Sequence, residues 1–207
     1  MNQKNSLGLN ICFKDEYNPI VLFKEWYLKA KKSEINDPNA VAIGTVSSKG
    51  YPTVRMVLLK EYNDDGFIFY TNFNSDKSKA IKKNPKVSMC FHWKSLQRQV
   101  RILGNASRVS EKKANDYFNS RSYGSKIGAW ASDQSSILKK RGDLIKIINQ
   151  YKKKFPNKNE VPRPRYWSGW KVKPNEIEFW LDGDNRIHER LKYLKKKNKW
   201  KKFLLNP

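Results

Sequence analysis

The sequence predicts an α+β domain in which a barrel-like antiparallel sheet is flanked by helices. Short segments rich in β-branched and aromatic residues recur along the chain, as strands require. Turn signals separate several of them, among them Ser48-Lys49-Gly50 and Asn63-Asp64-Asp65-Gly66. Amphipathic helical segments interrupt this meander, and no internal repeat is present. At 207 residues the chain fits about one large domain with a core of its own.

The individual elements follow from periodicity and punctuation. A helix is expected over 19–33, because Pro19 suits a first turn and Leu22, Phe23, Trp26 and Ala30 recur at helical spacing. Further helices are expected at 75–83, 111–119, 127–131 and 137–154. Strands are expected at 40–47, 53–62, 67–71, 86–93, 99–109, 166–172, 177–181, 186–194 and 200–204. Residues 1–18 are expected to form a flexible N-terminal segment, and 19–207 a single domain.

Composition argues against several classes of protein. Cys12 and Cys90 match no CxxC spacing, so a disulfide framework is not expected and a reducing, cytoplasmic compartment fits better. His92 and His188 lie in no Cys/His/carboxylate cluster, which argues against a metal site. No apolar run approaches the roughly 20 residues of a membrane helix, and the first 13 residues do not resemble a signal peptide.

The formal net charge is +24 and the pI about 10. Such a charge is compatible with a basic barrel that binds nucleic acid. However, lysine greatly outnumbers arginine and is spread along the chain, whereas nucleic-acid readers more often cluster arginines and aromatics on one surface. We therefore favour a compositional origin for the charge and keep nucleic-acid binding as the alternative.

One segment near the C-terminus carries the clearest sign of chemistry. Arg186, His188 and Arg190 occupy alternate positions, so on an extended strand they would share a face. Two guanidinium groups and an imidazole on one face suit a multiply charged anion. Glu178 and Trp180 lie just upstream.

Other cations stand at places where a phosphate could bind. Arg55 and Lys60 are five residues apart on an apolar strand, so they either face opposite sides or are brought together by a bulge. Tyr70-Thr71 ends a strand, and Ser75-Asp76-Lys77 opens a helix whose free N–H groups could accept an anion, although the same residues could form a plain cap.

Two further groups have both a functional and an ordinary interpretation. Gln99 can donate and accept hydrogen bonds, as a flavin or nucleobase edge requires, or it can simply be exposed. Tyr117, Arg121 and Ser125 are spaced by four and could bind a phosphate, because the planar guanidinium binds phosphate bidentately; they could also mark a surface helix end.

Taken together, these segments resemble the pyridoxamine/pyridoxine 5′-phosphate oxidase family. The resemblance runs from about residue 19 to the C-terminus and rests on ordered motifs: RMVLLK at 55–60, YTN at 70–72, RQV at 98–100, YFNSR at 117–121, SKIGAWASDQSS at 125–136, IEFW at 177–180 and RIHER at 186–190. It implies an antiparallel FMN-binding split β-barrel with flanking helices, which forms a homodimer with FMN at the subunit interface.

The resemblance also assigns residues to ligands. It implies that FMN contacts Arg55, Met56, Val57, Leu58, Leu59, Lys60, Tyr70, Thr71, Asp76, Lys77, Gln99, Gln134, Ser135, Trp180 and Arg190. It places the substrate phosphate on Lys60, Tyr117, Arg121 and Ser125, and it gives Arg186 and His188 the catalytic role of flanking the substrate ring. Asp76 departs from the family, which usually has a basic residue there, and no N-terminal substrate-closing arm aligns before Pro19.

The implied activity is the oxidation of pyridoxamine or pyridoxine 5′-phosphate to pyridoxal 5′-phosphate. Hydride would pass to FMN, O2 would be reduced to H2O2, and ammonia would leave from the amine substrate. A split barrel that binds flavin without catalysis is a second alternative. Arg186, His188, Tyr117 and Arg121 argue against it, because a relic would not need both clusters.

Overall fold

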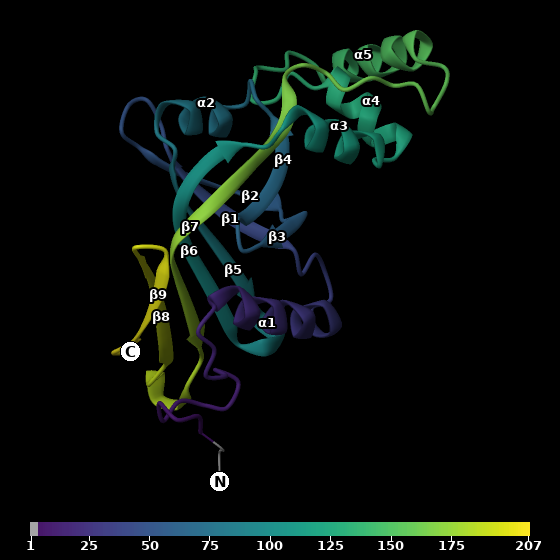
Figure 1. Cartoon of the computed structure of the whole chain (residues 1–207). Coiled ribbons are helices and arrows are strands. Elements are labelled where there is room, and N and C mark those ends of the chain that lie inside the picture. The colour runs from purple at the N-terminus through teal and green to yellow at the C-terminus, as the bar shows by residue number, and fades with distance from the viewer. Residues whose placement is uncertain (1–3) are drawn as a thin grey trace.

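The computed structural model describes residues 4–207, and within them one strongly curled sheet forms the body of the molecule (Figure 1). Every pairing between its named strands is antiparallel. The strands are β1 (Ala40–Val46), β2 (Pro52–Leu58), β3 (Glu61–Asn63), β4 (Gly66–Asn72), β5 (Lys86–Trp93), β6 (Arg98–Arg108), β7 (Trp167–Leu181), β8 (Glu189–Lys196) and β9 (Lys199–Leu205). The order β2-β1-β5-β6-β7-β4-β3 closes most of a barrel, and the β8–β9 hairpin extends from β7. The predicted α+β antiparallel class is therefore confirmed.

The long strand β7 explains how a hairpin can branch from the barrel. Its first residues pair with β4 between Trp167 and Val172, and its last residues pair with β8 between Glu176 and Leu181. Against β6 the register shifts between Leu103 and Gly104, where β7 contributes one extra residue. This irregularity bends the strand, so that its two halves can serve two parts of the sheet.

Five α-helices flank the sheet within the described residues: α1 (Pro19–Ser33), α2 (Asp76–Lys83), α3 (Glu111–Asn119), α4 (Tyr123–Ala131) and α5 (Arg141–Lys154). Helix α1 begins where Asn18 accepts a hydrogen bond from the N–H of Ile20 and Pro19 occupies the first turn. Its apolar stripe packs into the curled sheet. Phe23 lies edge-on to Phe67 with ring centroids 4.9 Å apart, and Trp26 meets Phe179 at 5.1 Å. This contact fills the main core.

Helices α3, α4 and α5 form a separate lobe beside β4 and the start of β7 (Figure 1). A second apolar cluster holds this lobe to the sheet, centred on Phe118, Ile127, Val161 and Trp167. The lobe and the strand ends of the barrel thus enclose a space between them, which is the cavity described below.

The face of the sheet that points away from α1 is unusually apolar for an exposed surface. Val54, Met56 and Leu58 alternate along β2 and are 70%, 60% and 40% exposed, and Leu103 on β6 is 46% exposed. Contiguous exposed apolar side chains on a sheet face are typical of an interface with another protein surface.

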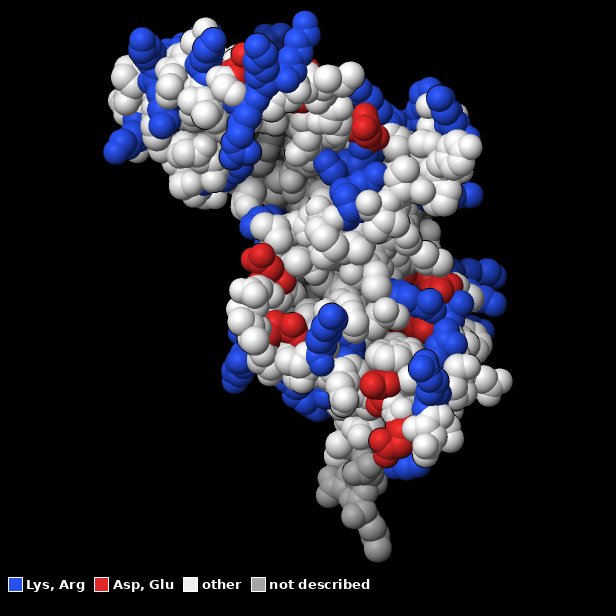
Figure 2. Space-filling model, turned by 180° about the vertical axis from the view of Figure 1, so that it is seen from behind, with Lys and Arg blue, Asp and Glu red and all other residues white. Residues whose placement is uncertain are grey.

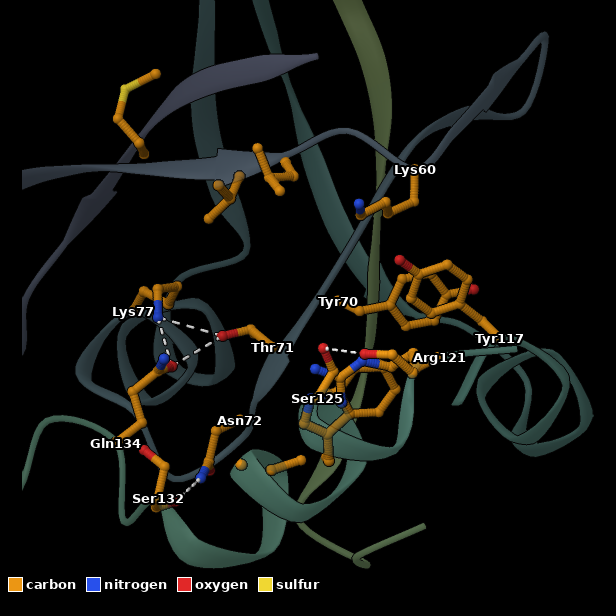
Figure 3. A pocket seen from close by; sticks show the side chains of 17 residues that line it. Lys60, Tyr70, Thr71, Asn72, Lys77, Tyr117, Arg121, Ser125, Ser132 and Gln134 are labelled. Carbon is orange, nitrogen blue, oxygen red and sulfur yellow. Dashed lines mark hydrogen bonds between the residues drawn. The ribbon is translucent and has the colours of Figure 1, made fainter. Parts of the chain in front are cut away.

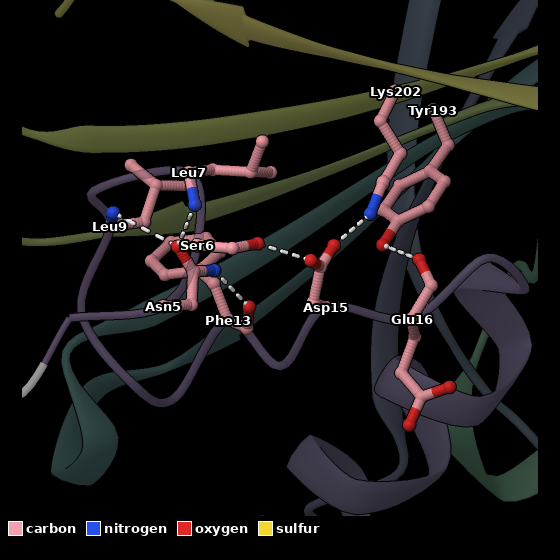
Figure 4. Close-up of polar contacts among 9 residues, drawn as sticks. All are labelled: Asn5, Ser6, Leu7, Leu9, Phe13, Asp15, Glu16, Tyr193 and Lys202. Atoms are coloured by element: carbon pink, nitrogen blue, oxygen red, sulfur yellow. Dashed lines mark hydrogen bonds and ion pairs between the residues drawn. The ribbon is translucent and has the colours of Figure 1, made fainter.

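The N-terminal segment packs against the β8–β9 hairpin (Figure 4). Phe13 is fully buried, the indole of Trp26 donates to the carbonyl of Cys12 at 2.8 Å, and the hydroxyl of Tyr193 donates to the carbonyl of Glu16 at 2.8 Å. Lys202 forms an ion pair with Asp15. Residues 4–18 are therefore part of the folded unit in this structure. The flexibility expected for residues 1–18 concerns motion and stays a prediction.

Most elements lie where the sequence predicts them, including helix 19–33, helix 111–119 and strand 86–93. Four of the strand predictions are wrong. The strand expected at 53–62 is two strands, because the chain turns after Leu58, and the strands expected at 166–172 and 177–181 are one continuous strand. The strand expected from Arg186 begins only at Glu189. Helix α4 also starts four residues earlier than the predicted Ile127, and α5 starts at Arg141.

The cations are widely distributed over the surface. On the face shown in Figure 2, Lys and Arg gather on the helical lobe and also form separate patches over the barrel, where acidic side chains lie among them. This distribution agrees with the compositional interpretation of the +24 charge.

Candidate active site

A cavity of about 630 Å³ opens between the barrel and the helical lobe. Its walls come from β2, β4, the α2 N-terminus, α3, α4 and the segment after α4 (Figure 3). The lining residues are Met56, Val57, Leu58, Lys60, Tyr70, Thr71, Asn72, Lys77, Tyr117, Arg121, Ser122, Ser125, Gly128, Ala129, Ser132, Gln134 and Trp167. Polar groups occupy two separate regions of this cavity, and apolar side chains lie between them (Figure 3).

The first polar region contains Lys60, Tyr117, Arg121 and Ser125 (Figure 3). Lys60 enters the cavity because the chain turns between β2 and β3, where the Lys60 N–H donates to the carbonyl of Ile68 at 2.8 Å. Tyr117 comes from α3, Arg121 from the turn after it and Ser125 from α4. A phenol, a hydroxyl and two cations thus converge from four segments of the chain, and this donor set suits a phosphate.

Arg121 is the most constrained member of this region. Its guanidinium lies 4.6 Å above the ring of Trp167 and 5.6 Å from that of Phe118. Its Nη1 is buried and has no hydrogen-bond acceptor among residues 4–207. Burial lowers the pKa of Arg121, and nearby Tyr117 partly offsets this. A buried cation with an unsatisfied donor is expensive, so the geometry calls for an anion at this point.

The second polar region is built around Lys77 on α2. This side chain is only 9% exposed, and its Nζ donates to Gln134 Oε1 at 2.8 Å, Thr71 Oγ1 at 3.2 Å and Ser75 Oγ at 3.3 Å. All three acceptors are neutral. Burial and the nearby charge of Arg55 lower the pKa of Lys77, whereas Asp76 acts in the opposite direction. A phosphate here would supply the negative charge that the buried ammonium lacks.

Arg55 and Asp76 lie beside this region rather than in the main cavity. They line a separate cavity of about 440 Å³ together with Ser47, Ser48, Thr53, Lys79, Ala80 and Lys83. The guanidinium of Arg55 donates to Thr45 Oγ1 at 2.7 Å and to Thr53 Oγ1 at 2.6 Å, so it is tied to its own sheet. Arg55 and Lys60 therefore serve different cavities, which resolves the question left open by their spacing.

Between the two polar regions the walls are aromatic and aliphatic. Tyr70 and Tyr117 stack with centroids 4.0 Å apart, and Tyr70 stacks on Trp167 at 5.4 Å. Burial, together with nearby acidic and phenolic groups, raises the pKa of Tyr70 to about 12, so its hydroxyl stays protonated and can donate. Met56, Val57 and Leu58 also line the cavity. A flat aromatic ligand fits such a surface.

The remaining predicted residues gather elsewhere, on the exposed face of the sheet. Gln99 pairs with Trp180 across β6 and β7, and Trp180 pairs with Arg190 across β7 and β8. Residues paired directly across strands project to the same face. Three side chains that the resemblance assigns to FMN therefore form one row, which we call the Gln99–Trp180–Arg190 row.

A tight loop over residues 182–188 carries the two predicted catalytic side chains. Asn185 and Arg186 adopt left-handed φ angles of 54° and 64°, so Arg186 is not on a strand, and the expected alternation of Arg186, His188 and Arg190 along one strand is wrong. The loop instead brings the His188 ring to 4.7 Å from that of Trp180. Nδ1 of His188 faces the Asp182 carboxylate at 2.9 Å and the N–H of Gly183 at 3.3 Å, so it can donate to the first when protonated or accept from the second when neutral.

The structure thus divides the predicted site residues into groups. It brings together in the main cavity Met56, Val57, Leu58, Lys60, Tyr70, Thr71, Lys77, Tyr117, Arg121, Ser125 and Gln134. It places outside that cavity Arg55, Leu59, Asp76, Gln99, Ser135, Trp180, Arg186, His188 and Arg190. Leu59 is a core residue, 3% exposed. Ser135 lies next to the cavity, where its Oγ accepts from the Asp76 N–H at 3.3 Å.

Some lining residues were not predicted. Asn72 donates to the carbonyl of Ser132 at 3.1 Å and thereby fastens the segment that carries Gln134. Both residues fall inside quoted motifs, YTN and SKIGAWASDQSS, so a signal existed. Trp167 had none, because only the fold brings it beneath Arg121.

Among residues 4–207, no group of three or more His, Cys, Asp or Glu side chains is placed to hold a metal ion. No helix in that range combines the length and the apolar character that crossing a membrane requires.

Comparisons with known proteins agree with this geometry. Residues 28–181 match the family model described as pyridoxamine 5′-phosphate oxidase, and residues 167–207 match that of the pyridoxine 5′-phosphate oxidase C-terminal dimerisation region. A protein from Pelagibacter ubique named pyridoxine/pyridoxamine 5′-phosphate oxidase is 59% identical over the whole of both chains. One of the same name from Allorhizobium ampelinum is 48% identical over 94% of this chain and 95% of its own.

Solved structures show the same architecture. The crystal structure of PhzG from Burkholderia lata 383 in complex with tetrahydrophenazine-1-carboxylic acid aligns with a TM-score of 0.88 at 28% identity, covering 95% of this chain and 96% of that one. A pyridoxamine 5′-phosphate oxidase-related, FMN binding protein from Nostoc punctiforme PCC 73102 aligns at 0.74 over 93% of this chain and all of its own. At 15% identity the latter shows the fold alone.

The fold therefore places the protein in the class of antiparallel split-barrel proteins. The matched models and relatives are more specific. The chain belongs to the pyridoxine/pyridoxamine 5′-phosphate oxidase family, and the family predicted from the sequence motifs is confirmed.

Proposed function

We propose that the protein is an FMN-dependent oxidase that converts pyridoxamine or pyridoxine 5′-phosphate to pyridoxal 5′-phosphate with O2. The observation that carries this proposal is one cavity with two anion-seeking regions, around Lys77 and around Arg121. Both FMN and the B6 substrate consist of a flat ring system with one phosphate. Two such ligands stacked on each other would present two phosphates to one cavity.

FMN fits the residues around Lys77. The ammonium has only neutral partners, and Thr71, Ser75 and Gln134 supply further polar atoms. The α2 N-terminus beside them adds backbone N–H groups. The substrate phosphate would bind at Arg121, Lys60, Tyr117 and Ser125. When bound, FMN supplies the redox chemistry by accepting a hydride equivalent and passing electrons to O2.

We further propose that the site is completed by a second protomer. In one chain the Gln99–Trp180–Arg190 row and the loop bearing Arg186 and His188 lie outside the cavity. The same exposed face carries Met56 and Leu58, which also line the cavity. A two-fold dimer through this face would bring one protomer's row to the other's cavity, so FMN would lie at the interface.

In such a dimer the protein's own residues divide the work. Arg121 and Lys60 bind the substrate phosphate, and this holds the ring in place against the stacked aromatic wall. Arg186 and His188 flank the ring from the partner side and position it, with His188 able to hold or release a proton at its imidazole. Alignment of substrate over cofactor provides much of the rate enhancement.

The test is anaerobic mixing of the FMN-loaded protein with pyridoxamine 5′-phosphate. We expect the absorbance of the oxidised flavin to bleach and then to recover when air is admitted. Pyridoxal 5′-phosphate should form in proportion. A protein that binds FMN but keeps its flavin oxidised with this substrate would refute the oxidase proposal.

A further inference from the structure

We propose that Glu178 is a positioning residue for Arg190, whose guanidinium it holds in the orientation needed at the FMN site. The inference rests on the proposed function, because it takes Arg190 as an FMN contact. Glu178 was not among the predicted site residues, and it lines none of the main cavity.

The contacts of Glu178 are unusual for a strand residue on an outer face. Glu178 is only 2% exposed. Its Oε1 accepts from Arg190 Nε at 2.9 Å, and its Oε2 is paired with Arg101. Three strands, β6, β7 and β8, are thus joined through one carboxylate. Burial alone would raise the pKa of Glu178, but the hydrogen bonds from Arg190 and Arg101 outweigh it and lower the pKa, so the group is ionised.

Arg190 is held from a second side as well. Its Nη1 donates to the backbone carbonyl of Asn206 at 2.9 Å. Two of its nitrogens therefore have fixed partners, and Nη2 has no hydrogen-bond partner among residues 4–207. A planar guanidinium bound at Nε and Nη1 cannot rotate freely. The direction of the remaining donor, Nη2, is therefore set by the partners of Nε and Nη1.

The location gives this arrangement a purpose. Arg190 belongs to the Gln99–Trp180–Arg190 row, and Glu178 lies one step along the same face, diagonally across β7 and β8. The triad of Glu178, Arg101 and Arg190 keeps a net positive charge. Glu178 therefore orders Arg190 without cancelling the field that an anionic or electron-rich cofactor would meet.

The same strands provide a matched control. Glu176 and Lys192 form an ion pair at 2.8 Å with the same diagonal geometry, two residues further along β7 and β8. Its side chains are 21% and 28% exposed, and neither belongs to the predicted site. A purely structural role for such pairs would make Glu178→Gln and Glu176→Gln alike in their effect on ligands.

The experiment titrates FMN into the full-length apoprotein and follows quenching of flavin fluorescence. For Glu178→Gln we expect about tenfold weaker FMN binding, the scale of one charge-assisted hydrogen bond, and for Glu176→Gln a change below about twofold. Arg190→Ala should weaken binding at least as much. Adding Glu178→Gln to Arg190→Ala should cause little further loss, because Glu178 acts through Arg190.

Provided that wild-type protein binds FMN, two outcomes would overturn the inference. The first is that Glu178→Gln binds FMN as tightly as Glu176→Gln does. The second is that Glu178→Gln lowers FMN affinity on the Arg190→Ala background by as much as it does in the wild-type protein. If Glu178→Gln fails to fold, Glu178→Asp replaces it, because it keeps the charge and shortens the reach to Arg190. We then expect weakened FMN binding that also disappears on the Arg190→Ala background, and full wild-type affinity would refute the role. Wild-type protein that does not bind FMN would instead refute the proposed function.

Discussion

Arg121 offers the sharpest test of the proposal that the substrate phosphate and the FMN phosphate bind in different regions of the cavity. Replacing Arg121 with alanine removes a buried guanidinium whose Nη1 has no acceptor among residues 4–207. If the substrate phosphate is that acceptor, the lost interaction is a charge-assisted hydrogen bond of about 1.5–3 kcal/mol. At about 1.4 kcal/mol per factor of ten, KM for pyridoxamine 5′-phosphate should rise roughly 10- to 100-fold. Arg121→Lys should lie between, since it keeps the charge but loses the planar fork.

The assay compares substrates with and without the phosphate. Steady-state oxidation is measured for pyridoxamine 5′-phosphate and for pyridoxamine, and FMN affinity is measured separately. We expect Arg121→Ala to erase most of the preference for the phosphorylated substrate, with FMN affinity and the KM for pyridoxamine nearly unchanged. Equal losses for both substrates would refute a phosphate-binding role, as would an FMN affinity that falls in parallel.

A control variant tests whether stacking alone explains the effect. Arg108 lies 4.6 Å above the ring of Phe73, the same distance that separates Arg121 from Trp167, but it lines no part of the cavity. Arg108→Ala removes a comparable cation–π contact. It should leave the kinetic constants for both substrates unchanged, and a rise in KM like that of Arg121→Ala would contradict the assignment.

Three further predictions follow from other parts of the site. Lys77→Met should weaken FMN binding roughly 10- to 100-fold without raising substrate KM, because it removes the buried ammonium of the second polar region. Gly183→Ala should slow flavin reduction roughly 10- to 100-fold while FMN binding persists, because its Cβ would lie 2.1 Å from the Ile187 carbonyl oxygen and displace the loop that carries Arg186 and His188. The stability advantage of wild type over Glu178→Gln, about 2 kcal/mol, should be constant above the ordinary glutamate pKa of 4.5 and should shrink as pH falls through the lowered folded pKa.

Each of these has its own measurement and control. Fluorescence titration measures the FMN affinity of Lys77→Met and compares it with that of Lys83→Met, which replaces an exposed lysine of the same helix. A similar loss of FMN affinity in both variants would contradict the first prediction. Stopped-flow absorbance measures the rate of flavin reduction in Gly183→Ala and compares it with the rate in Gly142→Ala, in which the added methyl group meets open space. The third prediction is checked by chemical unfolding of wild type and Glu178→Gln between about pH 3 and 7, because a native carboxylate with a lowered pKa contributes its stabilisation only when ionised. A difference in the free energy of unfolding that does not depend on pH would contradict it.

Local signals predicted most of the fold because they reside in short segments. The cap and apolar stripe of α1, the β5 segment and α3 were all recoverable from residue spacing. The failures occurred where distant partners decide the conformation. Two separate strands were predicted at 166–172 and 177–181, yet β7 runs on as one strand that carries an extra residue at its register shift against β6. Arg186 fitted an alternating strand pattern, yet the loop after Asp182 turns it into a left-handed conformation.

The candidate site divides in the same way. The sequence predicted Lys77, Tyr117 and Arg121 as anion-binding groups, since charge and donor capacity belong to the residues themselves. That Trp167 lies beneath Arg121, and that Gln134 accepts from Lys77, could not be predicted, because those neighbours are remote in sequence. The pairing of Glu178 with Arg101 and Arg190 could not be predicted either, since the three residues lie on three different strands that only the sheet brings together.

By itself, the sequence determined the family, the α+β class and the chemical character of each cluster, because ordered motifs and local periodicity are properties of the chain. The tertiary structure alone decided which clusters share a cavity. It separated the Lys77 and Arg121 regions within one space, and it placed Gln99, Trp180 and Arg190 in a row on an outer face. The physical reason is that strand register and sheet curvature set distances between side chains far apart in sequence, and binding depends on those distances.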